Sequence, residues 1–156
     1  LSASAYGCAG QRCMAGSVAV AVGQVADQLV NELCDYAGTL RVGPTDGQDQ
    51  VDMGPLIRRE HRQRVSGYLD IAAEEGAEVA LDGRTNYKDE GFLLGPCVVD
   101  RVEPSMRLAR EEIFGPVLQV LHAEMLDDAI ALINANPYGN GTALFTRSGA
   151  ADRLGS

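Results

Sequence analysis

The sequence predicts an α/β fold in which helices pack on a mostly parallel sheet. Segments with helical spacing of apolar residues alternate along the chain with short runs rich in β-branched residues, which is typical of this architecture. The composition agrees, since 46% of the 156 residues are hydrophobic, 22% are charged and none is tryptophan. A chain of this length can bury a sizeable core, so we expect residues 1–156 to belong to one domain.

The first expected helix begins at Met14 and extends through Leu33 to about Tyr36, with Gly38 as a plausible C-cap. Its apolar residues are spaced by three or four positions. They are Val18, Val22, Val25, Leu29 and Leu33. Its small-residue run from Ala15 to Ala21 suits close approach to other backbone.

Three more helices and five strands are expected further along the chain. One helix covers roughly Arg58 to Glu75 and stops at Gly76, and another begins at Asp127-Asp128 and ends at Asn136-Pro137. A last helix starts near Ser148. The expected strands are residues 40–43 (LRVG), 78–83 (EVALDG), 92–100 (FLLGPCVVD), 116–123 (PVLQVLHA) and 139–146 (GNGTALFT).

The charge and cysteine content exclude several classes of function. A net charge of −9 argues against a nucleic-acid partner, whose binding depends on neutralising phosphates. No apolar run is long enough to span a membrane and no signal-peptide pattern is present, so we expect a cytoplasmic protein. The four cysteines lack metal-site spacing and are expected to be reduced thiols, with no metal bound. Because Leu1 is not an initiator methionine and the chemical motif follows so soon, we expect a piece of a longer polypeptide.

The first chemical motif is YGCAGQRCMAG, from Tyr6 to Gly16. Cys13 falls at the expected start of the first helix, where backbone N–H groups and the helix dipole would favour a thiolate and could hold an oxyanion. Arg12 adds positive charge beside it. The alternative is a small cysteine packed in the core before a buried helix. His61 and His122 are both distant from Cys13 in sequence, so a Cys–His hydrolase pair is disfavoured.

The second chemical motif is EEIFGPV, from Glu111 to Val117. Two adjacent carboxylates make a poor buried strand unless one of them has a polar partner. A carboxylate can bind a vicinal diol and the ring of Phe114 can pack on a planar heterocycle, an arrangement that suits the ribose and base of a nicotinamide. The alternative is a solvated acidic turn followed by a core phenylalanine. The arginine cluster 58, 59, 62 and 64 is expected to form a solvated helix face rather than an anion site.

Together, YGCAGQRCMA and EEIFGP, in that order, resemble the aldehyde dehydrogenase superfamily. DMGPLI, FLLGPCVV and NPYGNGTALFT extend the resemblance along nearly the whole chain. It implies the catalytic-domain fold of that superfamily, with Cys13 as the nucleophile. It also implies that Glu112 binds the nicotinamide ribose and that Phe114 packs near the nicotinamide of NAD.

Within the superfamily, GQRCMA with NPYGNGTALFT is most similar to the CoA-acylating branch that acts on methylmalonate and malonate semialdehyde. There Arg12 would bind the carboxylate of this small-molecule substrate, and coenzyme A would accept the acyl group. The resemblance implies a homo-oligomeric parent, a dimer or tetramer. It also implies that the dinucleotide-binding domain, the oxyanion-hole amide, the general-base position and the oligomerisation segment lie outside this chain, which alone would be inactive. A hydrolytic aldehyde dehydrogenase that gives a free acid, or a non-catalytic structural module, remains the alternative, and Cys8 has no assigned role.

Overall fold

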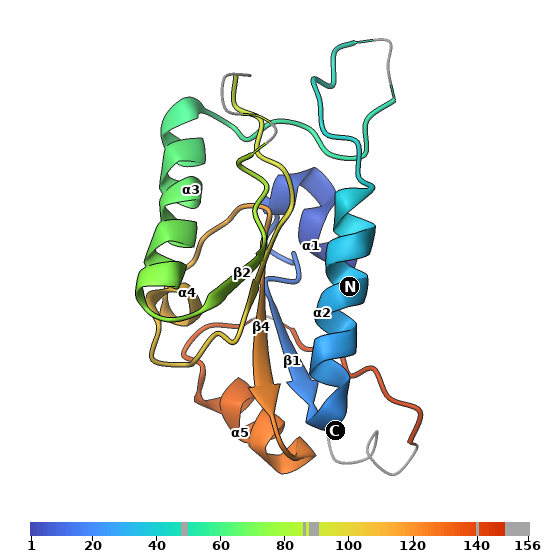
Figure 1. The fold of residues 1–156 in the computed structure, drawn as a ribbon, viewed down its shortest axis with the longest axis vertical. Helices are drawn as coiled ribbons and strands as arrows, with labels where there is room; N and C mark the ends of the chain where they lie inside the picture. The colour runs from blue at the N-terminus through green and yellow to red at the C-terminus, as the bar shows by residue number, and fades with distance from the viewer. Residues whose placement is uncertain (48–49, 86, 88–90, 140, 149–156) are drawn as a thin grey trace.

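The computed structural model describes residues 1–47, 50–85, 87, 91–139 and 141–148. Within them the predicted α/β fold is confirmed: a four-stranded sheet lies between flanking helices (Figure 1). The strand order is β1-β4-β3-β2. The strands are β1 (Val18–Val22), β2 (Glu78–Leu81), β3 (Cys97–Asp100) and β4 (Val117–Ala123). Strand β4 runs parallel to β1 and β3, whereas β2 is antiparallel to β3, so the sheet is mostly parallel as predicted.

Helices cover both sides of this sheet, because its central strands are apolar on both faces. Strand β3 is buried at all four positions, and β4 is buried at every position except His122. Parallel strands with such continuous apolar runs need cover on each face. Helices α2 (Ala26–Gly38) and α3 (Arg59–Glu74) lie on opposite sides (Figure 1). The remaining helices are α1 (Ser2–Tyr6), α4 (Arg107–Arg110), α5 (Leu126–Ala135) and the short 3-10 turns η1 (Gly7–Gly10) and η2 (Gly23–Val25).

The expected helix from Met14 to Leu33 is wrong in its first half. Residues Val18–Val22 form strand β1, and helix α2 begins only at Ala26. The sequence VAVAV fits both patterns, because its valines match a helical stripe with the residues that follow and also alternate as in a strand. Parallel pairing of β1 with β4 decides between them, since it places these β-branched residues in the sheet.

The later elements follow the predictions more closely, with several differences. The expected strand 92–100 is a strand only over Cys97–Asp100. Helix α3 matches within a residue at each end, Gly76 stops it with a left-handed φ of 96°, and α5 ends before Asn136 as expected. Gly38, however, lies in the last turn of α2. Residues 40–43 supply only an isolated bridge from Val42 to Met53. The described residues of the expected strand at 139–146 form no strand and are exposed, because no described strand lies alongside to pair with them, and the expected helix after Ser148 falls outside the described residues.

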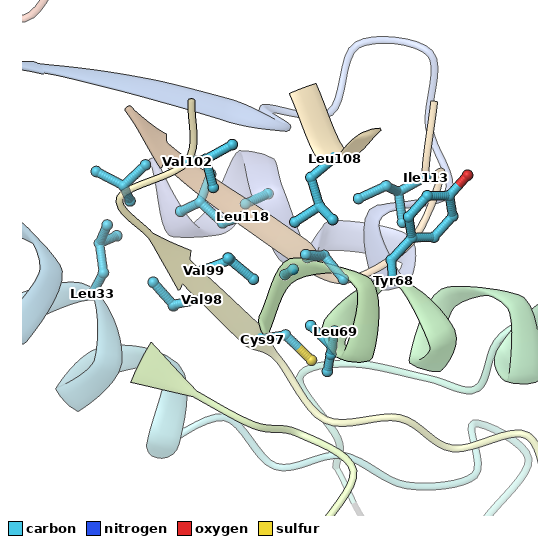
Figure 2. Close-up of a cluster of buried hydrophobic side chains, with 14 of the residues drawn as sticks. Leu33, Tyr68, Leu69, Cys97, Val98, Val99, Val102, Leu108, Ile113 and Leu118 are labelled. Atoms are coloured by element: carbon cyan, nitrogen blue, oxygen red, sulfur yellow. The ribbon is translucent and has the colours of Figure 1, made fainter. Parts of the chain in front are cut away.

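The core fills both sides of β3 and β4 (Figure 2). Leu33 from α2 lies near Val98, while Leu69 from α3 lies near Cys97 (Figure 2). Cys97 is fully buried in this core, and its carbonyl accepts a 3.1 Å hydrogen bond from the hydroxyl of Tyr6. This bond joins the helix before the cysteine motif to the sheet. None of the described helices is both long and apolar enough to cross a membrane.

Candidate active site

Cys13 lies in a turn, not at the start of a helix. Its segment leaves α1 through η1, where Cys8 and Ala9 have a φ of 53° and Gly10 has a φ of 69°. These left-handed residues redirect the chain into a turn closed by a 3.1 Å bond from the Ala15 N–H to the Arg12 carbonyl. The helix N-terminus that was expected to favour a Cys13 thiolate is therefore absent from this turn, because the sequence after it forms β1. Cys13 is exposed, so the alternative of a packed core cysteine is also wrong.

Two glycines bring the two predicted motifs into direct contact. A Cβ placed on Gly10 would lie 2.2 Å from the carbonyl oxygen of Gly115, so only a glycine allows the two backbones to approach this closely. A Cβ on Gly115 would in turn lie 2.8 Å from a methyl group of Val65 in α3. GQRC, EEIFGP and α3 thus meet at one point.

The motif NPYGNGTALFT also reaches the cysteine turn. A Cβ on Gly141 would lie 3.4 Å from the terminal methyl of Met14, the residue after Cys13. A segment near the end of the described chain therefore lies beside the cysteine turn.

Arg12 is held by the helix that precedes it. Its Nη2 donates a 3.0 Å hydrogen bond to the carbonyl of Ser4, one of the last carbonyls of α1, and its guanidinium lies against Gly7. A guanidinium has five N–H donors, so this bond leaves others for an acidic ligand. The side chain is exposed beside Cys13.

The two adjacent carboxylates of EEIFGP have different surroundings. Glu111 accepts a 2.6 Å bond from the Tyr68 hydroxyl and a 2.9 Å bond from Nε of Arg107. The hydrogen bonds from Arg107 and then Tyr68 lower the pKa of Glu111 to about 2. Glu112 is exposed, and its carboxylate makes no hydrogen bond to any residue that the structure describes. Glu111 is thus the carboxylate with the polar partner, and the carboxylate of Glu112 is exposed.

Side chains of α3 bind the backbone of the same motif. Arg64 donates to the carbonyls of Glu112, at 2.7 Å, and Ile113, at 3.2 Å, while Nε2 of His61 lies 2.8 Å from the carbonyl of Phe114. Arg64 is exposed, as the predicted solvated face requires, but its guanidinium also binds the first two of these carbonyls. Arg59 is exposed as well and lies 5.9 Å from the Phe92 ring centre. The half-buried Arg62, which binds the Tyr87 carbonyl, departs from the prediction. These contacts form because α3 lies beside loops whose backbone carbonyls need hydrogen-bond donors. The spacing of charges in the sequence does not show where such carbonyls lie.

An open groove of about 930 Å³ adjoins these motifs. Phe114 and Gln11 line it, and the Oε1 of Gln11 accepts a 3.1 Å bond from the Ile57 N–H across one wall. The other lining residues are Cys8, Thr45, Gly54, Pro55, Leu56, Ile57, Arg58, His61 and Phe92. A second hollow, of about 470 Å³ beside α5, contains no residue of either motif. The groove therefore borders both motifs, and of the predicted site residues Phe114 lines it whereas Cys13, Arg12 and Glu112 do not.

The family model that matches this chain is that of the aldehyde dehydrogenase family, over residues 1–154. The chain belongs to the aldehyde dehydrogenase family. It is 49% identical, over 98% of its length, to the acylating mitochondrial methylmalonate-semialdehyde/malonate-semialdehyde dehydrogenase of Rattus norvegicus. It is 46% identical, over 99% of its length, to the malonate-semialdehyde dehydrogenase of Pseudomonas aeruginosa. The chain spans 29% and 32% of these two relatives.

Crystal structures of other aldehyde dehydrogenases have the same fold. The methylmalonate-semialdehyde dehydrogenase of Oceanimonas doudoroffii superposes with a TM-score of 0.92 at 44% identity, and the match covers 97% of this chain and 32% of that one. A putative methylmalonate-semialdehyde dehydrogenase from Sinorhizobium meliloti 1021, complexed with NAD, has a TM-score of 0.91 at 40% identity, covering 98% and 32% of the two chains. The resemblance found in the sequence motifs is thus confirmed for the family and the fold.

Sequence reasoning did not find four side chains that shape the site of this aldehyde dehydrogenase chain. They are His61, Arg64, Tyr68 and Arg107. A usable signal was present, since the first three lie three and four positions apart and so share one face of α3. His122 contacts Asp100 at 2.7 Å, and His61 contacts Phe114, so each histidine has a partner other than Cys13. Among the residues that the structure describes, no three His, Cys, Asp or Glu side chains are grouped to hold a metal.

Proposed function

We propose that this chain is part of the catalytic domain of a longer NAD-dependent aldehyde dehydrogenase. Its substrate would be methylmalonate or malonate semialdehyde, and its acyl acceptor coenzyme A. The main support is the packing of Gly10 on Gly115, which joins the exposed cysteine turn to the motif assigned to the nicotinamide ribose. The names of the similar proteins support the choice of substrate, and the word acylating in some of them supports the choice of acceptor.

Cys13 is the proposed nucleophile. Its exposed sulfur can reach an aldehyde carbon from the turn, and attack by the thiolate gives a thiohemiacetal. The backbone N–H of Cys13 is proposed to help hold the oxyanion that forms. Arg12, fixed by its bond to Ser4, is proposed to hold the substrate carboxylate through its other N–H groups.

The residues of the EEIFGP motif fit the nicotinamide end of NAD. The exposed carboxylate of Glu112 can accept hydrogen bonds from a ribose diol, and Phe114 lines the groove where a flat ring would pack. When bound, NAD supplies the hydride acceptor, and the product left on Cys13 is a thioester. Neither motif offers a glycine-rich cradle for the phosphates, so NAD binding would depend on residues outside this chain.

The thioester carries a carboxylate β to its carbonyl, and loss of CO2 gives an enolate that the oxyanion donors can stabilise. After protonation, the thiol of coenzyme A attacks the thioester and displaces Cys13, giving propionyl-CoA or acetyl-CoA. A homo-oligomeric parent and a cytoplasmic location remain predictions, and the relative from Rattus norvegicus is named as mitochondrial.

The test uses the full-length enzyme that contains this segment, with malonate semialdehyde, NAD and coenzyme A. We expect NADH and acetyl-CoA to form together, and Cys13→Ser to abolish both. Cys34→Ser is the matched control, because Cys34 lies half-buried on α2 away from the turn and its loss should leave both products. NADH formation with a free acid and no need for coenzyme A would indicate a hydrolytic enzyme. No NADH from any semialdehyde would refute the proposal.

A further inference from the structure

We propose that helix α3 acts as a clamp that fixes the conformation of residues 112–114, with His61 and Arg64 as positioning residues for the NAD site. The effect on NAD rests on the proposed function, whereas the clamp itself rests on contacts within this chain. The "α3 clamp" means the three side chains His61, Arg64 and Tyr68.

The clamp binds three consecutive carbonyl groups. Arg64 donates to those of Glu112 and Ile113, and His61 binds that of Phe114. Successive carbonyls in a loop point in different directions and would otherwise be left to water. Their capture by one helix face leaves this stretch of backbone few ways to move.

The contact with His61 coincides with an unfavourable backbone conformation. Phe114 has a φ of 55°, in the left-handed region that a residue with a Cβ seldom adopts. A carbonyl only accepts hydrogen bonds, so Nε2 of His61 must carry the proton in the 2.8 Å contact. We infer that this bond helps to hold Phe114 in the conformation that places its ring along the groove.

The third member of the clamp separates the roles of the two glutamates. The Tyr68 hydroxyl donates to Glu111 and accepts a 3.2 Å bond from Arg64, so one connected network holds the Glu111 side chain and the backbone after it. Anchoring Glu111 in this way leaves the neighbouring Glu112 carboxylate exposed. Such preorganisation lowers the cost of ordering a binding group when its ligand arrives.

The first experiment measures backbone order in this chain by 15N relaxation. We expect amide order parameters of residues 112–115 near 0.85, the value of rigid backbone, and a fall toward about 0.6 in His61→Leu. His61→Gln should restore the order, since its amide N–H can donate in place of Nε2. Gln63→Leu is the matched control, because Gln63 is exposed on the same helix and makes no hydrogen bond to the described residues. Arg64→Met is a second loss variant in case His61→Leu fails to fold.

The second experiment measures steady-state kinetics in the full-length enzyme. Loss of one such hydrogen bond should raise the KM for NAD about three- to tenfold in His61→Leu, with Gln63→Leu unchanged and His61→Gln close to wild type. Unchanged order parameters and KM in both His61→Leu and Arg64→Met would overturn the clamp. Failure of His61→Gln to restore either quantity would overturn the role of the hydrogen bond. If the enzyme shows no NAD-dependent oxidation, the proposed function fails, and the order parameters still decide whether the clamp exists.

Discussion

Replacing Gly10 with alanine tests the contact that joins the two motifs. The new methyl group would lie 2.2 Å from the Gly115 carbonyl oxygen, well inside contact distance, so one of the two backbones must shift. Gly10 also has a φ of 69°, and a left-handed residue with a Cβ costs about 1–2 kcal/mol. Overpacking of a filled site adds about 1–3 kcal/mol. We therefore expect Gly10→Ala to lower the free energy of unfolding by about 2–5 kcal/mol.

The assay is urea unfolding of this chain. With a slope of about 1–3 kcal/mol per molar urea, such a loss moves the midpoint down by at least about 0.7 M. Two other glycines separate the contributions. Gly76→Ala meets no atom within 4 Å at a φ of 96°, so it should show the cost of backbone strain alone. Gly38→Ala, in helix α2 with no atom within 4 Å, should be neutral or stabilising by up to about 1 kcal/mol.

The loss of unfolding free energy should be largest in Gly10→Ala, smaller in Gly76→Ala and absent in Gly38→Ala. If Gly10→Ala costs no more than Gly76→Ala, the two motifs are not in backbone contact, and the main support for the proposed function is lost. If Gly38→Ala is as harmful as Gly76→Ala, the effect assigned to a left-handed φ is wrong.

Three further predictions concern individual side chains. Arg12→Leu in the full-length enzyme should lower kcat/KM for malonate semialdehyde about ten- to a hundredfold and leave propanal nearly unchanged, because only the first substrate has a carboxylate to bind. Equal losses for both aldehydes would mean that Arg12 acts through the cysteine turn, which it holds by its bond to Ser4. Iodoacetamide labelling followed by peptide mapping should modify Cys13 first, with exposed Cys8 ahead of Cys34, and Cys97 last, because burial raises the pKa of Cys97 to about 12. Early labelling of Cys97 in the folded chain would contradict the structure. Finally, Glu111→Gln should destabilise the chain at neutral pH and have little effect near pH 2, since the pKa of Glu111 falls from 4.5 to about 2 on folding and the stability it contributes is lost as pH falls through that window. Equal urea midpoints for variant and wild type at neutral pH would refute this.

The fold class could be predicted because most elements have only one consistent periodicity. Strands β3 and β4 are mostly apolar runs, each preceded by a Gly-Pro pair, and α3 has a helical stripe that ends in a glycine. Strand β1 could not be predicted in this way, since Val18–Val22 suits a strand and a helix equally well. Its partner β4 lies almost a hundred residues later, and only that pairing settles the choice.

The sequence named candidate site residues, whose roles stay predictions, but it did not give the geometry of the site. The motifs identified Cys13, Arg12, Glu112 and Phe114, and the structure gathers their segments around Gly10 and Gly115. Because Val18–Val22 was expected to be helical, Cys13 was also expected at the start of a helix. That error in secondary structure produced the wrong expectation that a helix N-terminus favours the Cys13 thiolate. The contacts of α3 with successive carbonyls could not be foreseen, because backbone direction in a loop leaves no trace in composition or charge.

The arrangement has a consequence for how this site responds to substitution. Its motifs are joined largely through backbone atoms: the carbonyl of Gly115 against Gly10, and the carbonyls of residues 112–114 against α3. Side chains that never touch a ligand, such as Arg64, can therefore move the Glu112 carboxylate and the Phe114 ring by moving the backbone that carries them. Loss of Arg64 should change NAD affinity while leaving attack by Cys13 on an aldehyde intact. Gly10→Ala should impair both, because Gly10 belongs to the cysteine motif and packs against Gly115 of the other motif. If loss of Arg64 impaired both NAD binding and aldehyde attack while Gly10→Ala impaired only one of them, the two motifs would be coupled by a route other than their shared backbone contact.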